Sequence, residues 1–211
     1  MSKTSITHNK LLNKYLAEKK LLDDYRKDAV NEKMPVVDNQ VARFIEVFCM
    51  LKKPKNILEI GCGCGYSSYF LIKNLGRGQY TGIDLNKDRL LRAREFLNGI
   101  YGQKTMHFCH GDALQIIPTL EEKFDLVFID GAKYQYPDYL KSLMGKVGRS
   151  GFILADNVFY GGRVFRPACS SHHQNSLSGI SEYLNLVSNR NNFRTRLYDI
   201  GDGISVSEVW L

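Results

Sequence analysis

Two apolar segments of the chain each end in oxygen-bearing side chains. Asp130 follows the segment 124–129, and Asp156 and Asn157 follow the segment 151–155. Short apolar runs of this kind are typical of buried parallel strands, whose carboxyl ends meet at one edge of a sheet where ligands bind. We therefore expect the three side chains to converge, and an all-oxygen ligand set suits a hard cation such as Mg²⁺.

Lys133 stands three residues after Asp130. A divalent cation beside a lysine lowers the pKa of the amine, because the two positive charges repel each other. Lys133 is thus a candidate base for a hydroxyl whose own pKa falls on the metal. Taken singly, Asp156 and Asn157 could cap a turn and Lys133 could be a solvated side chain, but their combination favours a reaction centre.

The composition is that of an ordinary globular protein. The chain has 211 residues, which fits one α/β domain, and its net charge of +7 suits either an acidic partner such as RNA or simply a basic surface. The five cysteines are an odd number, which argues against a secreted disulfide framework and favours a cytoplasmic protein. No apolar run reaches the length of a membrane span, and the first residues lack the apolar core of a signal peptide.

The apolar pattern predicts alternating strands and helices around the candidate centre, hence a Rossmann-like α/β fold with helices on both faces of a mostly parallel sheet. A glycine turn near the end predicts an antiparallel C-terminal hairpin, which brings the sheet to seven strands. Strands are expected at 57–60, 80–83, 106–109, 126–129, 152–155, 194–200 and 204–209, and helices at 67–75, 87–97, 113–120, 139–147 and 180–188.

Extra helices are expected before this core. Residues 6–29 have apolar side chains at helical spacing among many charges, which predicts one or two amphipathic helices, and Asp38 can cap a further helix. We expect the whole chain, residues 1–211, to form a single domain in which the helices of residues 1–53 pack on the core of residues 54–211. The apolar stripe of the first helix could instead face a second subunit.

A glycine cluster, Gly61, Gly63 and Gly65, follows the first expected strand and precedes a helix. Glycine is needed where the backbone turns sharply and lets a ligand approach closely. Asp84 ends the next strand, where a carboxylate can accept hydrogen bonds from ribose hydroxyls. These residues together predict a nucleotide-type cofactor.

Two cofactors fit this arrangement. A dinucleotide fingerprint requires Gly or Ala where this chain has Tyr66. Glu59, two residues before the first glycine, would add negative charge beside a pyrophosphate, but it suits a positively charged ligand. S-adenosylmethionine has a sulfonium and an amino group, so it fits better, with Glu59 near its amino-acid end and Asp84 at its ribose. Asp112 could read an adenine edge or merely cap the following helix.

These residues resemble the class I methyltransferases, and among them the metal-dependent O-methyltransferases that include catechol and caffeoyl-CoA enzymes. The resemblance runs from about Met34 to the C-terminus. The segments 34–38 and 130–136 are similar to a small bacterial branch, some of whose members methylate 5-hydroxyuridine at the wobble position of tRNA. The motifs that carry the family resemblance are Leu58-Glu59-Ile60-Gly61, Gly65-Tyr66-Ser67, Phe128-Ile129-Asp130-Gly131-Ala132-Lys133, Ala155-Asp156-Asn157-Val158 and Gly201-Asp202-Gly203-Ile204.

The resemblance implies roles for individual residues. Asp130, Asp156 and Asn157 would bind Mg²⁺ or another divalent cation, and Lys133 would be the catalytic base. The methyl group would pass from S-adenosylmethionine to a hydroxyl beside a second metal-chelating oxygen, in a catechol-like small molecule or in tRNA. Members of the family often dimerise, so a homodimer is expected. The implied cofactor contacts are Val37, Glu59, Gly61, Ser67, Asp84, Ala113 and Asp130.

Two other functions stay open from the sequence. The glycine loop with Asp84 would also suit a dinucleotide-dependent oxidoreductase, and the positive charge would suit a non-catalytic RNA-binding module. Arg163 and Arg166 could meet a phosphate or carboxylate on the substrate or could be plain surface residues. His172 and His173 are expected to be exposed, because neighbours on a polar loop rarely share a metal ion.

Overall fold

The computed structural model describes residues 3–102, 105–166 and 173–210. The chain forms two compact units, Met1–Val36 and Val37–Leu211. The first unit contains the helix α1 (Lys3–Asn31), so the helical pattern predicted at 6–29 belongs to one helix of 29 residues. The packing of this helix on the core stays a prediction. Of the helices in the described part of the chain, none combines the length and apolar character that a membrane crossing requires.

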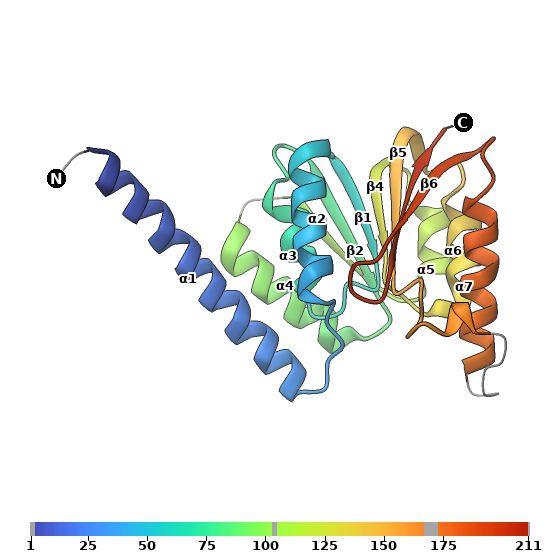
Figure 1. Cartoon of the computed structure of the whole chain (residues 1–211), viewed down its shortest axis with the longest axis horizontal. Coiled ribbons are helices and arrows are strands. Elements are labelled where there is room, and N and C mark those ends of the chain that lie inside the picture. Colours follow the sequence, from blue (N-terminus) through green and yellow to red (C-terminus); the bar gives the residue numbers. More distant parts are fainter. Residues whose placement is uncertain (1–2, 103–104, 167–172, 211) are drawn as a thin grey trace. The chain divides into compact units, whose positions relative to one another are not determined.

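The second unit contains a seven-stranded sheet with the order β3-β2-β1-β4-β5-β7-β6 (Figure 1). The first five strands along the chain are parallel, β7 is antiparallel to β5, and β6 is antiparallel to β7. The predicted Rossmann-like sheet with its C-terminal hairpin is therefore confirmed. The strands are β1 (Asn56–Ile60), β2 (Gln79–Asp84), β3 (Thr105–His110), β4 (Phe124–Ile129), β5 (Val147–Asp156), β6 (Phe193–Tyr198) and β7 (Ile204–Val209).

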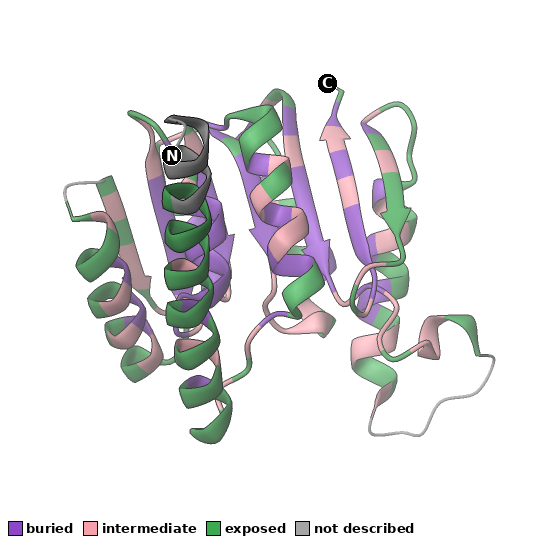
Figure 2. Ribbon diagram, turned by 60° about the vertical axis from the view of Figure 1, so that its left-hand side comes forward, coloured by how far each residue is buried: buried purple, intermediate pink, exposed green. Residues whose placement is uncertain are grey.

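Helices cover both faces of the sheet, and the buried residues concentrate on the central strands (Figures 1 and 2). Parallel strands covered on both faces are mostly apolar, which explains the apolar run 126–129 of β4 and the apolar residues that flank the buried Glu59 in β1. One face carries α2 (Asn39–Lys52), α3 (Tyr66–Lys73) and α4 (Lys87–Tyr101), and the other carries α5 (Ala113–Ile116), α6 (Tyr136–Leu143) and α7 (Gln174–Val187), with short 3-10 turns η1 (Ile117–Thr119), η2 (Lys133–Gln135) and η3 (Arg163–Phe165).

The predicted core helices have different bounds in the structure. The helices expected at 67–75 and 87–97 are α3 and α4, which end at Lys73 and Tyr101. The helix expected at 139–147 begins earlier, as η2 and α6, because Pro137 occupies the first turn, where proline is favourable. It also ends earlier, because the backbone from Val147 already belongs to β5. The helix expected at 113–120 is α5 followed by η1, and α7 begins six residues before the expected 180.

Candidate active site

One edge of the sheet collects the ends of four parallel strands. Ile60 of β1 is in register with Ile83 of β2 and with Ile129 of β4, and Ile129 is in register with Ala155 of β5. The β6–β7 turn reaches the same edge, because Ile204 pairs with Asp156. The residues that follow the four aligned positions are Gly61, Asp84, Asp130 and Asp156, and all of them are predicted site residues.

The glycine loop folds over this edge between β1 and β2. Gly61 N donates to Ile83 O at 2.8 Å, and Gly63 N donates to Asp84 Oδ2 at 2.8 Å. A Cβ added to Gly61, whose φ is +86°, would lie 2.5 Å from Asp130 O. Only glycine therefore fits at this position, where the loop passes directly against the end of β4. The glycine loop therefore contacts both Asp84 at the end of β2 and Asp130 at the end of β4.

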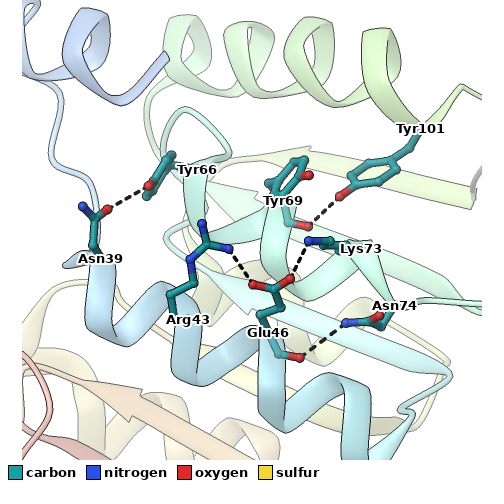
Figure 3. Close-up of polar contacts among 8 residues, drawn as sticks. All are labelled: Asn39, Arg43, Glu46, Tyr66, Tyr69, Lys73, Asn74 and Tyr101. Carbon is teal, nitrogen blue, oxygen red and sulfur yellow. Dashed lines mark hydrogen bonds and ion pairs between the residues drawn. The ribbon is translucent and has the colours of Figure 1, made fainter. Parts of the chain in front are cut away.

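The loop is also tied to the start of α2. Tyr66 OH donates to Asn39 Oδ1 at 2.8 Å (Figure 3). Asn39 follows Asp38, whose carboxylate caps α2 by accepting from Gln40 N at 2.7 Å. The buried Val37 directly precedes this cap, so the predicted cofactor contact at Val37 is held beside the glycine loop.

Further polar contacts hold α2 against α3 below this point (Figure 3). The Glu46 carboxylate of α2 accepts from Arg43 at 2.7 Å and from Lys73 of α3 at 2.5 Å. Tyr101 OH of α4 donates to Tyr69 O of α3 at 2.9 Å. The helix that follows the glycine loop is therefore braced from both sides.

Glu59 is fully buried behind the loop. Its carboxylate accepts hydrogen bonds from Ser67 Oγ, Ser68 Oγ and Tyr80 OH, each at 2.5 Å. Burial raises the pKa of Glu59 to about 7, the negative charge of Asp130 adds to the rise, and the three hydroxyls oppose it. The predicted cofactor residues Glu59 and Ser67 thus belong to one buried network, which Ser68 and Tyr80 complete.

The third strand end carries Ala113, the first residue of α5, which is buried. Asp112 caps this helix by accepting from Leu114 N at 3.0 Å, so the capping alternative for Asp112 holds in the structure. Gly111 N donates to Asp84 O at 3.0 Å and joins this end to its neighbour. Six of the predicted cofactor contacts therefore belong to connected segments along one sheet edge. They are Val37, Glu59, Gly61, Ser67, Asp84 and Ala113.

The other half of the edge carries the predicted base and the predicted metal ligands. Lys133 Nζ donates to Asp130 Oδ1 at 2.8 Å and to Tyr136 OH at 2.9 Å. Tyr136 OH in turn donates to Asp156 O at 2.9 Å. A second carbonyl oxygen, Ile129 O, lies 3.2 Å from the same hydroxyl. Sequence reasoning missed Tyr136, which is fully buried and joins the ends of β4 and β5. Its signal was the spacing of three residues from Lys133, which places both on one side of a helical turn.

Asp156 is 1% exposed, and its two carboxylate oxygens differ. Oδ1 accepts from Asn157 N at 2.8 Å, whereas Oδ2 is buried and has no hydrogen-bond partner among the described residues. Burial and the negative charge of Asp130 together raise the pKa of Asp156 to about 7. Asn157 follows with a left-handed backbone, φ 56°.

This environment fits a hard cation. A buried carboxylate oxygen without a partner is costly, and a second carboxylate nearby adds repulsion that a positive ion would remove. Within the described residues no group of three His, Cys, Asp or Glu side chains could hold a metal. A cation here would therefore rest on two carboxylates, an amide oxygen and water, which suits Mg²⁺ better than zinc.

The pKa of Lys133 depends on its two contacts. Burial alone would lower this pKa, but Tyr136 and the Asp130 carboxylate outweigh burial and raise the pKa above its usual value. Lys133 is thus protonated and ion-paired with Asp130 in this structure. The expected fall of its pKa beside a divalent cation stays a prediction.

The segment after β5 is fixed by the β6–β7 turn. Val158 N donates to Gly203 O at 3.0 Å, and Gly161 N donates to the Asp202 carboxylate at 2.7 and 2.8 Å. Sequence reasoning named Asp202 only as part of a motif. Its carboxylate holds the chain that follows Asp156 and Asn157 against the edge of the site.

Arg163 and His173 both contact Tyr160. Arg163 Nη1 donates to Tyr160 O at 3.3 Å, and its guanidinium lies 5.6 Å from the centre of the Tyr160 ring. Tyr160 OH lies 2.9 Å from His173 Nδ1. The prediction that His173 is exposed is therefore wrong, because this contact leaves it half-buried. Arg166 is exposed, and His172 lies outside the described residues.

Comparison with known proteins shows the family of the chain. The chain is 29% identical over 128 residues, 58% of each chain, to a catechol O-methyltransferase of Niastella koreensis. Its fold is similar to that of TomG, an O-methyltransferase of Streptomyces achromogenes solved in complex with SAM, with 24% identity, TM-score 0.78 and coverage of 90% of this chain and 89% of that one. It is also similar to a Bacillus cereus O-methyltransferase in complex with SAH, with 22% identity, TM-score 0.80 and coverage of 89% and 90%. The sequence model of the O-methyltransferase family matches residues 11–208, and the protein therefore belongs to that family.

Proposed function

We propose that the protein transfers a methyl group from S-adenosylmethionine to a substrate hydroxyl and that it depends on Mg²⁺ or another divalent cation. The observation that carries the metal dependence is the buried, unpartnered Oδ2 of Asp156 beside the Asp130–Lys133 pair, in the part of the chain that the structure describes. The O-methyltransferase family supports the reaction class. Asp130, Asp156 and Asn157 would hold the cation, which when bound lowers the pKa of a coordinated hydroxyl.

S-adenosylmethionine would lie over the glycine loop and supply the methyl group on its sulfonium. The loop fits this ligand, because its glycines let the backbone turn tightly along the strand ends and Asp84 stands at the next strand end. Glu59 and Ser67 would face its amino-acid end, where a buried negative charge favours an ammonium group. The TomG and Bacillus cereus structures, solved with SAM and SAH, support this choice.

Lys133 would accept the proton from the acceptor hydroxyl. Its Nζ lies 2.8 Å from Asp130 Oδ1, so it stands at the same strand end as the proposed cation ligands. Because the Asp130 charge helps to raise the pKa of Lys133, neutralisation of that charge would lower this pKa and favour the neutral amine that can act as a base. The Tyr136 hydroxyl holds this amine in place.

The substrate would be either a catechol-like molecule or 5-hydroxyuridine in tRNA, since each offers a hydroxyl beside a second oxygen. The catechol O-methyltransferase of Niastella koreensis supports the first, and the net charge of +7 supports the second. Mass spectrometry of tRNA nucleosides from cells with and without the enzyme distinguishes the two candidate substrates. Loss of the methoxy nucleoside identifies tRNA, whereas unchanged tRNA directs the search to catechols. We also expect the protein to be a cytoplasmic homodimer. Analytical ultracentrifugation of the purified protein measures the number of subunits.

Calorimetry and activity assays test the proposed reaction. Titration should show S-adenosylmethionine binding, and methyl transfer should fall to a small residual rate in Asp130→Ala and Lys133→Ala. Lys141→Ala is the matched control, because Lys141 is an exposed lysine on α6 that pairs only at the surface with Asp138 and Glu182. Binding of NADH without any affinity for S-adenosylmethionine would instead favour an oxidoreductase. Binding of RNA without any turnover would favour a non-catalytic module.

A further inference from the structure

Helix α7 contains a glycine where the η2 turn crosses it. A Cβ added to Gly179 would lie 2.6 Å from Tyr134 Cα, 2.7 Å from Lys133 O and 2.8 Å from Tyr134 O. All three are backbone atoms of η2, so no rotation of a side chain could make room. Glycine destabilises the interior of a helix relative to alanine, and here it stands where the backbone of another element comes unusually close.

The turn that rests on Gly179 carries the proposed base. Lys133 Nζ is held at 2.8 Å from Asp130 Oδ1 and at 2.9 Å from Tyr136 OH. One helical turn after Gly179, the ring of Tyr183 packs edge-on against the ring of Tyr136, with centroids 5.6 Å apart. Positions 179 and 183 lie on the same face of α7, so this face supports both Lys133 and its hydrogen-bond partner.

We infer that Gly179 is a positioning residue for Lys133: its missing side chain lets α7 seat the η2 turn so that the amine stands at the Asp130 carboxylate. This inference rests on the proposed function, in which Lys133 accepts the substrate proton. Ordinary contact begins at about 3.4 Å, so a methyl group at position 179 requires η2 to retreat by about 0.8 Å. A misplacement of about 1 Å at a reacting group can cost on the order of 100-fold in rate.

The first test is Gly179→Ala in the full chain, with Gly99→Ala as the matched control. Gly99 also lies inside a helix, α4, and a Cβ there would meet no described atom within 4 Å. We expect kcat for methyl transfer to fall roughly 10- to 100-fold in Gly179→Ala, with KM and Kd for S-adenosylmethionine within about twofold of wild type. Gly99→Ala should keep wild-type kcat. An unchanged kcat in Gly179→Ala overturns the inference.

A double-mutant cycle separates positioning from general damage. If Gly179 acts through Lys133, then Gly179→Ala should slow the Lys133→Ala protein no further. Equal fractional losses in both backgrounds would show that the glycine serves the fold alone. If Gly179→Ala yields no folded protein, Tyr183→Leu removes the other support of the turn, and the same non-additivity with Lys133→Ala is expected.

Crystal structures keep this test independent of the proposed function. If the wild-type protein transfers no methyl group to any acceptor, the proposed function fails, and the inference on Gly179 is decided by the position of Lys133. In Gly179→Ala we expect Lys133 Nζ to lie outside hydrogen-bond distance of Asp130 Oδ1. An unchanged separation of 2.8 Å would overturn the inference.

Discussion

Replacing Glu59 with Gln should change how stability depends on pH. Glu59 is fully buried, and its pKa is raised from 4.5 to about 7, chiefly by burial. Because the folded-state pKa lies above the unfolded one, the carboxyl's contribution to stability is fully present below about pH 4.5 and is lost as the pH rises through 7. The difference between the two pKa values corresponds to about 3 kcal/mol.

Urea unfolding of wild type and Glu59→Gln at intervals from pH 4.5 to 8.5 measures this effect. The amide does not titrate, and the raised pKa of Asp156 is common to both proteins, so the difference between their unfolding free energies isolates Glu59. We expect that difference to shift by about 3 kcal/mol in favour of Glu59→Gln across this range. Tyr80→Phe keeps the carboxyl but removes one donor, so it should extend the loss to higher pH. Parallel stability curves for wild type and Glu59→Gln would refute the reasoning.

Three other changes have expected outcomes of their own. Tyr136→Phe leaves Asp156 O without its hydroxyl donor and should lower the unfolding free energy by about 1–3 kcal/mol in urea; a loss below about 0.5 kcal/mol would contradict the role given to this hydroxyl. Asp38→Ala removes the cap of α2 and should cost about 1 kcal/mol by the same assay, whereas an unchanged midpoint would mean that the cap adds nothing. Asp202→Ala releases Gly161 N and should speed amide hydrogen exchange in residues 158–162, and unchanged exchange there would count against the anchoring role of Asp202.

The sheet and the strand-end residues could be predicted from the sequence for a geometric reason. Parallel strands end at one edge whatever their side chains, so two apolar runs that end in Asp130 and Asp156 already place both carboxylates there. The glycine loop is equally local, because Gly61, Gly63 and Gly65 stand between the end of β1 and the start of α3. The register of the strand ends follows from these runs, whereas the irregularity between Phe124 and Leu126, where β4 pairs with β5, does not.

The contacts that complete the site could not be predicted in this way. Tyr80 reaches Glu59 from another strand, and Tyr160 meets His173 across thirteen positions of chain, so each contact depends on how elements pack. A close approach such as that of Gly179 to the η2 turn is visible only once the helix and the turn have been placed. Helix bounds near Pro137 also differed, because the short η2 turn has no strong pattern of its own.

The most direct test concerns the cation at Asp130 and Asp156. Transfer of a labelled methyl group from S-adenosylmethionine to a catechol and to tRNA bearing 5-hydroxyuridine is measured after treatment with a chelator, with and without added Mg²⁺. We expect no transfer to either acceptor in the chelator, recovery with Mg²⁺ for one of the two, and no recovery in Asp156→Ala at the same Mg²⁺ concentration. Full methyl transfer in the presence of the chelator would contradict a metal-dependent centre at these strand ends.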